Sequence, residues 1–135
     1  MRRLLGILLM LPFSMLLLLF LIDASSIEYV WNNGGHDLPL FYRISAIWAG
    51  REGPLLLWVA MLGALLLIDG EQHSGESESQ HQLRLRLVIG FATLLLLIAL
   101  KLNPFSPTPS DATSRPGLNA LLQTDLMVIH PPVIF

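Results

Sequence analysis

The sequence predicts an all-α integral membrane protein with about three transmembrane helices and the start of a fourth. Of its 135 residues, 53% are hydrophobic and only 13% are charged, whereas soluble globular domains carry about 25% charged residues. A mean hydropathy of +0.63 agrees with this imbalance. Three long runs also lack any charged side chain and approach the length of a membrane-spanning helix. Together these observations place the chain in a bilayer.

The same composition excludes several classes of protein. Eight Lys and Arg against ten Asp and Glu residues leave no basic surface, so the sequence predicts no nucleic-acid binding. High hydrophobicity with low charge excludes intrinsic disorder. Since the chain has no cysteine, it can form no disulfide, thiolate metal site or iron–sulfur cluster and has no cysteine nucleophile.

The first charge-free run covers residues 4–22 and predicts a transmembrane helix over residues 1–22. Its nineteen residues are close to the ~20 apolar residues that cross the hydrocarbon layer. Pro12 interrupts the run, which a membrane helix tolerates when neighbouring groups satisfy the freed backbone. A cleavable signal peptide is the alternative, because two arginines precede the run and Ala-Ser-Ser follows it. The run exceeds the usual core of such a signal, which favours an uncleaved helix.

Two further runs, residues 53–68 and 87–100, predict the second and third transmembrane helices. The third is short, but basic side chains at both ends can extend it by snorkelling. The last run, residues 126–135, cannot span a membrane and predicts the start of a truncated helix. The expected segments are a first transmembrane helix (1–22), an extracytoplasmic loop with an amphipathic segment (23–52), a second transmembrane helix (53–69), a cytoplasmic link (70–82), a third transmembrane helix (83–102), an extracytoplasmic Pro-rich segment (103–130) and the start of a fourth helix (131–135).

Basic residues and prolines refine this organisation. Arg2 and Arg3 precede the first helix, and Arg84 and Arg86 precede the third. The other four basic residues would lie on the opposite side, so the number of charges gives no bias. The paired positions at helix ends nevertheless lead us to expect a cytoplasmic N-terminus. Four prolines, a glycine and several Ser and Thr residues fall within residues 103–117, which predicts an extended linker rather than a helix.

Three of the four histidines have no distinctive setting. His73 and His81 lie in the link rich in Glu, Ser and Gln and are expected to be solvated. A weak metal site formed by these two histidines with Glu76 stays an open alternative. His36 follows two glycines, and we expect it in a turn at the membrane surface.

His130 is followed by two prolines. A residue before proline is pushed out of the helical region, whereas proline suits the first turn of a helix. We therefore expect His130 at the junction where a membrane helix begins. A neutral imidazole there could be an axial ligand of haem iron, and an interfacial histidine without a cofactor is the alternative.

Residues 48–58 place Arg51 and Glu52 at the mouth of a membrane helix, between small residues and two tryptophans. The composition is typical of an aromatic belt with a charged interfacial anchor. The closely spaced glycines also predict the close approach of another helix or a planar ligand.

Three stretches together resemble the CcmF family, the haem lyase component of cytochrome c maturation, and its relative in nitrite-reductase haem attachment. The resemblance extends over about residues 20–135. The stretches are Tyr29-Val30 with Leu38-Pro39-Leu40-Phe41-Tyr42-Arg43, the segment from Trp48 to Trp58, and Asn103-Pro104-Phe105 with Leu118-Asn119-Ala120-Leu121-Leu122-Gln123 and His130-Pro131-Pro132. The sequence departs from the family at Arg51, where a histidine is usual, and at Ala120, where proline is usual. The family's tryptophan-rich motif lies beyond the His-Pro-Pro segment and is not in this sequence.

The resemblance implies a role in attaching haem to apocytochrome c at the outer membrane face, through thioether bonds to a Cys-x-x-Cys-His motif. His130 matches the family's axial ligand to the haem iron, which implies haem b with a second axial ligand from outside this chain. The implied partners are the remaining part of the haem lyase, a haem chaperone, apocytochrome c with its thiol-handling subunits, and membrane lipid. The implied location is a bacterial-type inner (plasma) membrane.

The leading functional hypothesis is the N-terminal part of a haem lyase, with no catalytic residue of its own and no activity alone. A non-catalytic membrane scaffold subunit and a fragment of a haem-transport protein are the alternatives.

Overall fold

The computed structural model describes residues 2–68, 77–126 and 128–129. These residues are mostly helical and contain no strand, which confirms the all-α class. The elements in chain order are α1 (Arg2–Leu21), α2 (Glu28–Asn33), α3 (Leu40–Ser45), the 3-10 helix η1 (Ala46–Trp48), α4 (Glu52–Ile68), α5 (Glu78–Leu102) and the 3-10 helix η2 (Ala120–Leu122).

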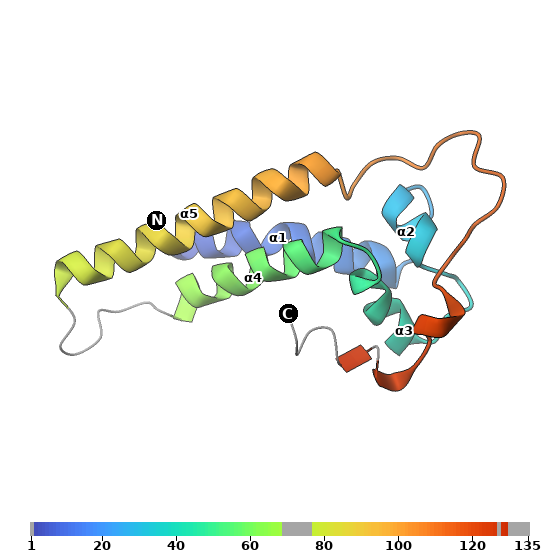
Figure 1. Cartoon of the computed structure of the whole chain (residues 1–135), viewed down its shortest axis with the longest axis horizontal. Helices are drawn as coiled ribbons and strands as arrows, with labels where there is room; N and C mark the ends of the chain where they lie inside the picture. Colours follow the sequence, from blue (N-terminus) through green and yellow to red (C-terminus); the bar gives the residue numbers. More distant parts are fainter. Residues whose placement is uncertain (1, 69–76, 127, 130–135) are drawn as a thin grey trace.

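The three long helices α1, α4 and α5 lie side by side and alternate in direction (Figure 1). Helices α1 and α4 pack closely at Gly6 and Gly63, where a Cβ on Gly63 would lie 2.6 Å from the carbonyl oxygen of Gly6. Small residues at such a crossing let two backbones pack closely, which matters in lipid because apolar surface gives little driving force there.

The outward faces of the long helices are apolar, as expected of surfaces that contact lipid. Both α1 and α5 are long and apolar enough to cross a membrane. The 17-residue α4 meets this test together with the segment Leu40–Trp48, from which it is bent by 89°. The structure therefore agrees with a multi-pass membrane protein that has two or three candidate spans.

Helix α5 begins at Glu78, five residues before the predicted start of the third helix. Ser77 caps it: the Ser77 hydroxyl accepts from Gln80 N at 3.3 Å, and Gln80 Oε1 accepts from Ser77 N at 3.1 Å. This capping box satisfies backbone donors that would otherwise be unpaired, so the polar residues that suggested a link form a helical turn. Residues 70–76 of the predicted link and the expected fourth helix at residues 131–135 lie outside the described residues.

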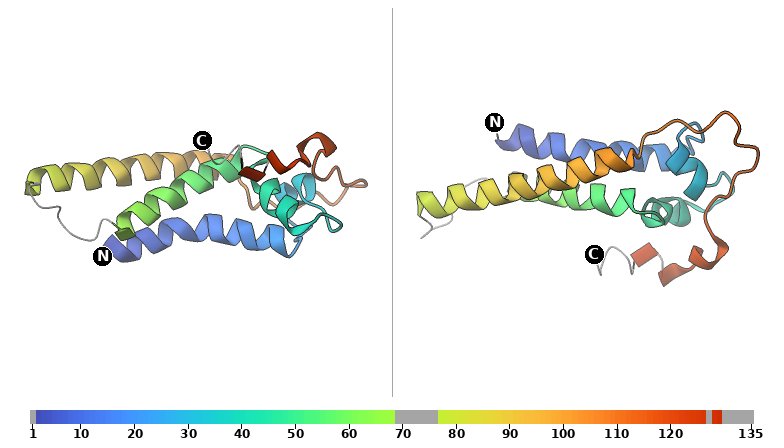
Figure 2. Two further views of the ribbon diagram at one scale, coloured as in Figure 1. Left: turned by 90° about the horizontal axis from the view of Figure 1, so that it is seen from below. Right: turned by 45° about the horizontal axis from the view of Figure 1, so that its top comes forward.

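Residues 22–51, 103–126 and 128–129 lie toward one end of the bundle, and we call this part of the structure the loop end (Figure 1). The starts of α1 and α5 and the end of α4 lie toward the opposite end (Figure 2). At the loop end, α2 and α3 pack beside the end of α1 and the start of α4.

Candidate functional site at the loop end

A buried cluster holds the loop end together. Phe20 from the end of α1 packs edge-on against Tyr29 of α2, with the ring centroids 5.6 Å apart. Val30, Ile47 and Leu118 are buried in the same cluster. Stretches far apart in the sequence therefore form one packed unit.

The hydroxyl of Tyr29 is the polar centre of this unit. It donates to the carbonyl oxygen of Ile47 at 2.6 Å and accepts from the backbone N–H groups of Gly50 at 3.2 Å and Gly53 at 3.3 Å. Burial raises the pKa of Tyr29 well above its ordinary value of 10, so the hydroxyl keeps the proton that it donates to Ile47. Tyr29 thereby ties α2 to the corner between η1 and α4.

Gly50 and Gly53 lie so close to neighbouring atoms at the corner that neither position has room for a side chain. A Cβ on Gly50 would lie 2.6 Å from Cε2 of Tyr29, and a Cβ on Gly53 would lie 1.8 Å from the carbonyl oxygen of Ile47. The close approach that the glycine spacing predicted is thus made by a ring of α2 and by the chain's own backbone.

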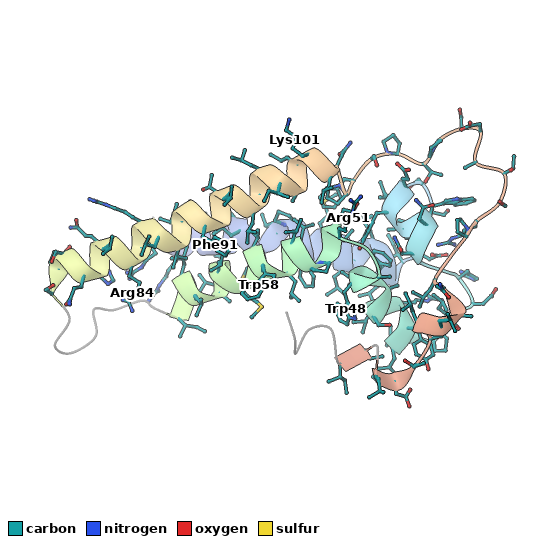
Figure 3. The ribbon with its side chains drawn as sticks, in the orientation of Figure 1. Trp48, Arg51, Trp58, Arg84, Phe91 and Lys101 are labelled. Carbon is teal, nitrogen blue, oxygen red and sulfur yellow. The ribbon has the colours of Figure 1, made fainter. Side chains whose placement is uncertain are left out.

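Arg51, Trp48 and Trp58, near the corner between η1 and α4, differ in exposure and in position along the chain's helices (Figure 3). Arg51 is exposed, and its backbone N–H donates to Oε2 of Glu52 at 3.0 Å. Trp48 ends η1 and packs against the buried cluster of the loop end. Trp58 lies six residues into α4, about 9 Å along the helix. The two tryptophans therefore do not lie at one level along α4, and the aromatic-belt interpretation stays a prediction.

An ion pair joins the end of α1 to the Pro-rich segment. Arg115 donates to both carboxylate oxygens of Asp23, at 2.8 and 2.5 Å. It also donates to the carbonyl oxygens of Val30 and Trp31, both at 3.2 Å, and its guanidinium lies 5.6 Å from the centre of the Trp31 ring. The hydrogen bonds from Arg115 hold the pKa of Asp23 below its ordinary value of 3.8, and those to Asp23 raise the pKa of Arg115.

The Pro-rich segment is extended, as predicted, but hydrogen bonds attach both of its ends to other elements. Ser106 O accepts from Glu28 N, and Ser26 O accepts from Thr108 N, both at 2.9 Å. The hydroxyl of Ser106 also donates to Oε2 of Glu28 at 3.0 Å. The segment thus packs on the start of α2 instead of serving as a loose linker.

We expect acid to weaken the Asp23–Arg115 contact. Because the folded-state pKa of Asp23 lies below its unfolded value, the stabilisation is present above that value and is lost as the pH falls through 3.8 toward the folded pKa. Asp23→Asn should lower the free energy of unfolding by about 2 kcal/mol at neutral pH. In this variant the free energy of unfolding should also fall less on acidification than in the unchanged chain. Unfolding in detergent micelles across this pH range measures both effects. Asp111→Asn, on an exposed loop position, is the control; an equal pH response in Asp23→Asn and the unchanged chain would contradict the prediction.

The two histidines that the structure describes, His36 and His81, lie at opposite ends of the bundle. His36 is exposed, its carbonyl oxygen accepts from Arg43, and it lines a polar pocket of about 460 Å³ together with Arg115 and Gln123. His81 lies at the opposite end, in the first turns of α5, with its ring nitrogens 3.1 Å from Arg2 and 3.0 Å from Arg84.

The candidate metal and haem sites involve residues outside the described part of the chain. His73 and Glu76 of the possible metal site, and His130, the predicted haem ligand, all lie there. Within the described ranges, no three His, Asp or Glu side chains come close enough together to hold a metal ion. The assignment of His130 therefore stays a prediction.

Sequence reasoning missed the two polar contacts that organise the loop end. Tyr29 was noted within a family-like stretch, but its role as a hydrogen-bonding centre was not. Asp23 and Arg115 are 92 residues apart, and an isolated arginine in a Pro-rich segment was the one available signal.

Comparison with known proteins finds relatives but no matching family model and no matching solved structure. The cytochrome c-type biogenesis protein CcmF of Haemophilus influenzae is 31% identical over 128 residues, which cover 91% of this chain and 19% of that protein. CcmF of Pseudomonas aeruginosa is 34% identical over 122 residues, or 86% of this chain and 18% of that protein. The cytochrome c-type biogenesis protein NrfE of H. influenzae is 30% identical over 121 residues. The chain thus spans about a fifth of the length of these curated relatives.

Proposed function

This chain is a CcmF-family sequence over about nine-tenths of its length, and we propose from that relationship that it is the N-terminal part of a cytochrome c maturation haem lyase. In this proposal it helps to hold haem at the outer membrane face for covalent attachment to the Cys-x-x-Cys-His motif of apocytochrome c. Its relatives carry the name cytochrome c-type biogenesis protein, which supports a role in cytochrome c maturation.

One structural observation supports the proposal most directly. The described parts of the three family-like stretches meet at the loop end. The hydroxyl of Tyr29, in the first stretch, accepts hydrogen bonds from the backbone N–H groups of Gly50 and Gly53 in the second. Leu118 of the third stretch lies in the same buried cluster as Tyr29. A shared surface made of these stretches is what a common functional site would need.

We assign His130 as one axial ligand of the haem iron. It follows Ile129, the last described residue, and residues 128–129 line a groove with α3 at the loop end. An imidazole suits haem iron, but a six-coordinate haem takes two axial ligands. His36, a histidine of the loop end, is exposed beside a polar pocket, which is a poor setting for the apolar face of a porphyrin. The proposed second ligand therefore comes from outside this chain.

The proposed orientation places the loop end on the outer face of a bacterial-type inner membrane and the N-terminus in the cytoplasm. Basic residues support it by position and not by number. The pairs Arg2–Arg3 and Arg84–Arg86 lie near the starts of α1 and α5, opposite the loop end, whereas the other four basic residues lie at or beside the loop end. The partners we propose are the remainder of the haem lyase, the haem chaperone, and apocytochrome c with its thiol-handling subunits.

Haem spectra test the assignment. The chain is co-expressed with the remaining part of the haem lyase, and the purified assembly is compared for the unchanged sequence, His130→Ala and His36→Ala. We expect His130→Ala to lose most of the bound haem and to shift the Soret band of what remains, because one axial ligand is gone. His36→Ala should retain both haem and spectrum. A His130→Ala assembly with unchanged haem content and an unchanged spectrum would remove the assignment.

A further inference from the structure

The segment Leu40–Trp48, made of α3 and η1, lies across the start of α4. The two axes are bent by 89° at a break of a few residues. If α4 runs along the membrane normal, as a spanning helix does, this segment lies parallel to the membrane plane. A short helix in that orientation, with one apolar face, is the geometry of an interfacial helix.

The depth of this segment is fixed by Arg43. Its guanidinium donates to the carbonyl oxygen of Leu21 at 3.2 Å, and Leu21 is the last residue of α1. The same side chain donates to Leu38 O at 3.0 Å and to His36 O. The charge of α3 is thus directed at the backbone where the first candidate span ends, which places α3 at the level of the membrane surface.

The outward side of α3 is apolar and unusually exposed. Leu40 is 61% and Phe41 71% exposed, and nearby Leu126 and Ile129 are 77% and 66% exposed. We call these four residues the interfacial patch. A largely apolar groove of about 500 Å³ lies between Phe41 on one side and Val128 and Ile129 on the other.

Lipid is the occupant that this placement favours. Leu18 and Ile22, at the end of α1, are also exposed, so apolar surface continues from the candidate span to the level of α3. Aromatic and aliphatic side chains at that level bind where headgroups meet acyl chains. The residues described as lining the groove include one acid, Asp125, and no basic side chain that could bind an anionic headgroup. The attraction of the groove for lipid is therefore apolar.

We infer that α3 lies flat in the headgroup layer at the loop end, with the interfacial patch inserted among the upper parts of the acyl chains. This contact would anchor the loop end to the bilayer surface. It goes beyond the proposed function and does not depend on haem.

Single-cysteine labelling tests this inference cleanly, because the chain has no native cysteine. Phe41→Cys is labelled with an environment-sensitive nitrobenzoxadiazole dye, and the full chain is reconstituted into phosphatidylcholine vesicles without other proteins. Thr113→Cys, on an exposed loop position, is the water-facing control, and Leu94→Cys, on the exposed face of α5, is the deep control. Leu40→Cys is a second reporter for the patch, in case the first variant folds poorly.

Three quenchers give the depth: iodide in water, a nitroxide near the lipid headgroup, and a nitroxide near the end of the acyl chain. We expect positions 40 and 41 to be quenched best by the shallow nitroxide and several-fold less by iodide than position 113. Position 94 should respond best to the deep nitroxide. If iodide quenches positions 40 and 41 as strongly as position 113, the patch faces water and the inference fails, which would favour a protein partner. Haem is absent from this measurement, so its result is independent of the haem assignment.

Discussion

Gly53→Ala is expected to disrupt the corner between η1 and α4. A Cβ at this position would lie 1.8 Å from the carbonyl oxygen and 2.7 Å from the carbonyl carbon of Ile47. Both atoms belong to the backbone, so a change of side-chain rotamer cannot relieve the clash, and the start of α4 must move away from η1. Overpacking of this kind costs about 3 kcal/mol. The same movement would separate the N–H of Gly53 from the hydroxyl of Tyr29.

Gly90→Ala is the matched control for this prediction. Gly90 lies within α5, and a Cβ there would meet no atom within 4 Å. Since alanine favours a helix over glycine by up to about 1 kcal/mol, this variant should be unchanged or slightly more stable. The free energy of unfolding of both variants can be measured in detergent micelles by circular dichroism. Equal stability of the two variants would show that the corner tolerates a side chain and would contradict the prediction.

The long helices could be predicted from the sequence because the bilayer imposes few choices. A backbone in lipid must satisfy its own hydrogen bonds, so a long apolar run forms a helix. The first run predicted a helix over residues 1–22, and α1 extends over Arg2–Leu21. The second predicted a helix over residues 53–69, and α4 extends over Glu52–Ile68. Helix α5 includes the predicted span 83–102 but begins at Glu78, because Ser77 and Gln80 form a capping box within the polar stretch that composition assigned to a link.

The arrangement of the loop end could not be predicted in the same way. Glycines near Arg51 indicated a close contact, but neither the 89° bend nor the partner of the contact follows from spacing. The Asp23–Arg115 pair depends on α1 ending beside the Pro-rich segment, and Asp23 itself adopts a left-handed conformation with φ 53°. Asp tolerates that conformation better than most residues, yet sequence alone does not say where it occurs.

The candidate site was predicted from resemblance to a family more than from physical pattern. His130 was singled out by the prolines that follow it, and the family motif gave it a role; the described residues reach Ile129 and leave that role as a prediction. What the structure adds is a reason for the family-like stretches to occur together. Tyr29 and Leu118 belong to different stretches but pack in one cluster, so each stretch supports the position of the others.

Removal of the Tyr29 hydroxyl should lower the free energy of unfolding by as much as Gly53→Ala. The N–H of Gly53 is in the first turn of α4, where backbone donors have no partner within the helix. In Tyr29→Phe this donor, the N–H of Gly50 and the carbonyl oxygen of Ile47 would all lose a partner in a buried setting. An unsatisfied buried polar group costs about 1–3 kcal/mol, and partial relaxation of the corner would reduce the sum, so we expect a loss of about 3 kcal/mol.

Tyr42→Phe separates this effect from the general loss of a phenol. The hydroxyl of Tyr42 makes one exposed contact, 3.5 Å from Oδ1 of Asp125, which is at the limit of a hydrogen bond. Its removal should change the free energy of unfolding by no more than about 0.5 kcal/mol. Unfolding of both variants in detergent micelles gives the comparison. A Tyr29→Phe variant as stable as Tyr42→Phe would mean that the corner is held by packing of the ring against Phe20, and that the three hydrogen bonds to the hydroxyl contribute little.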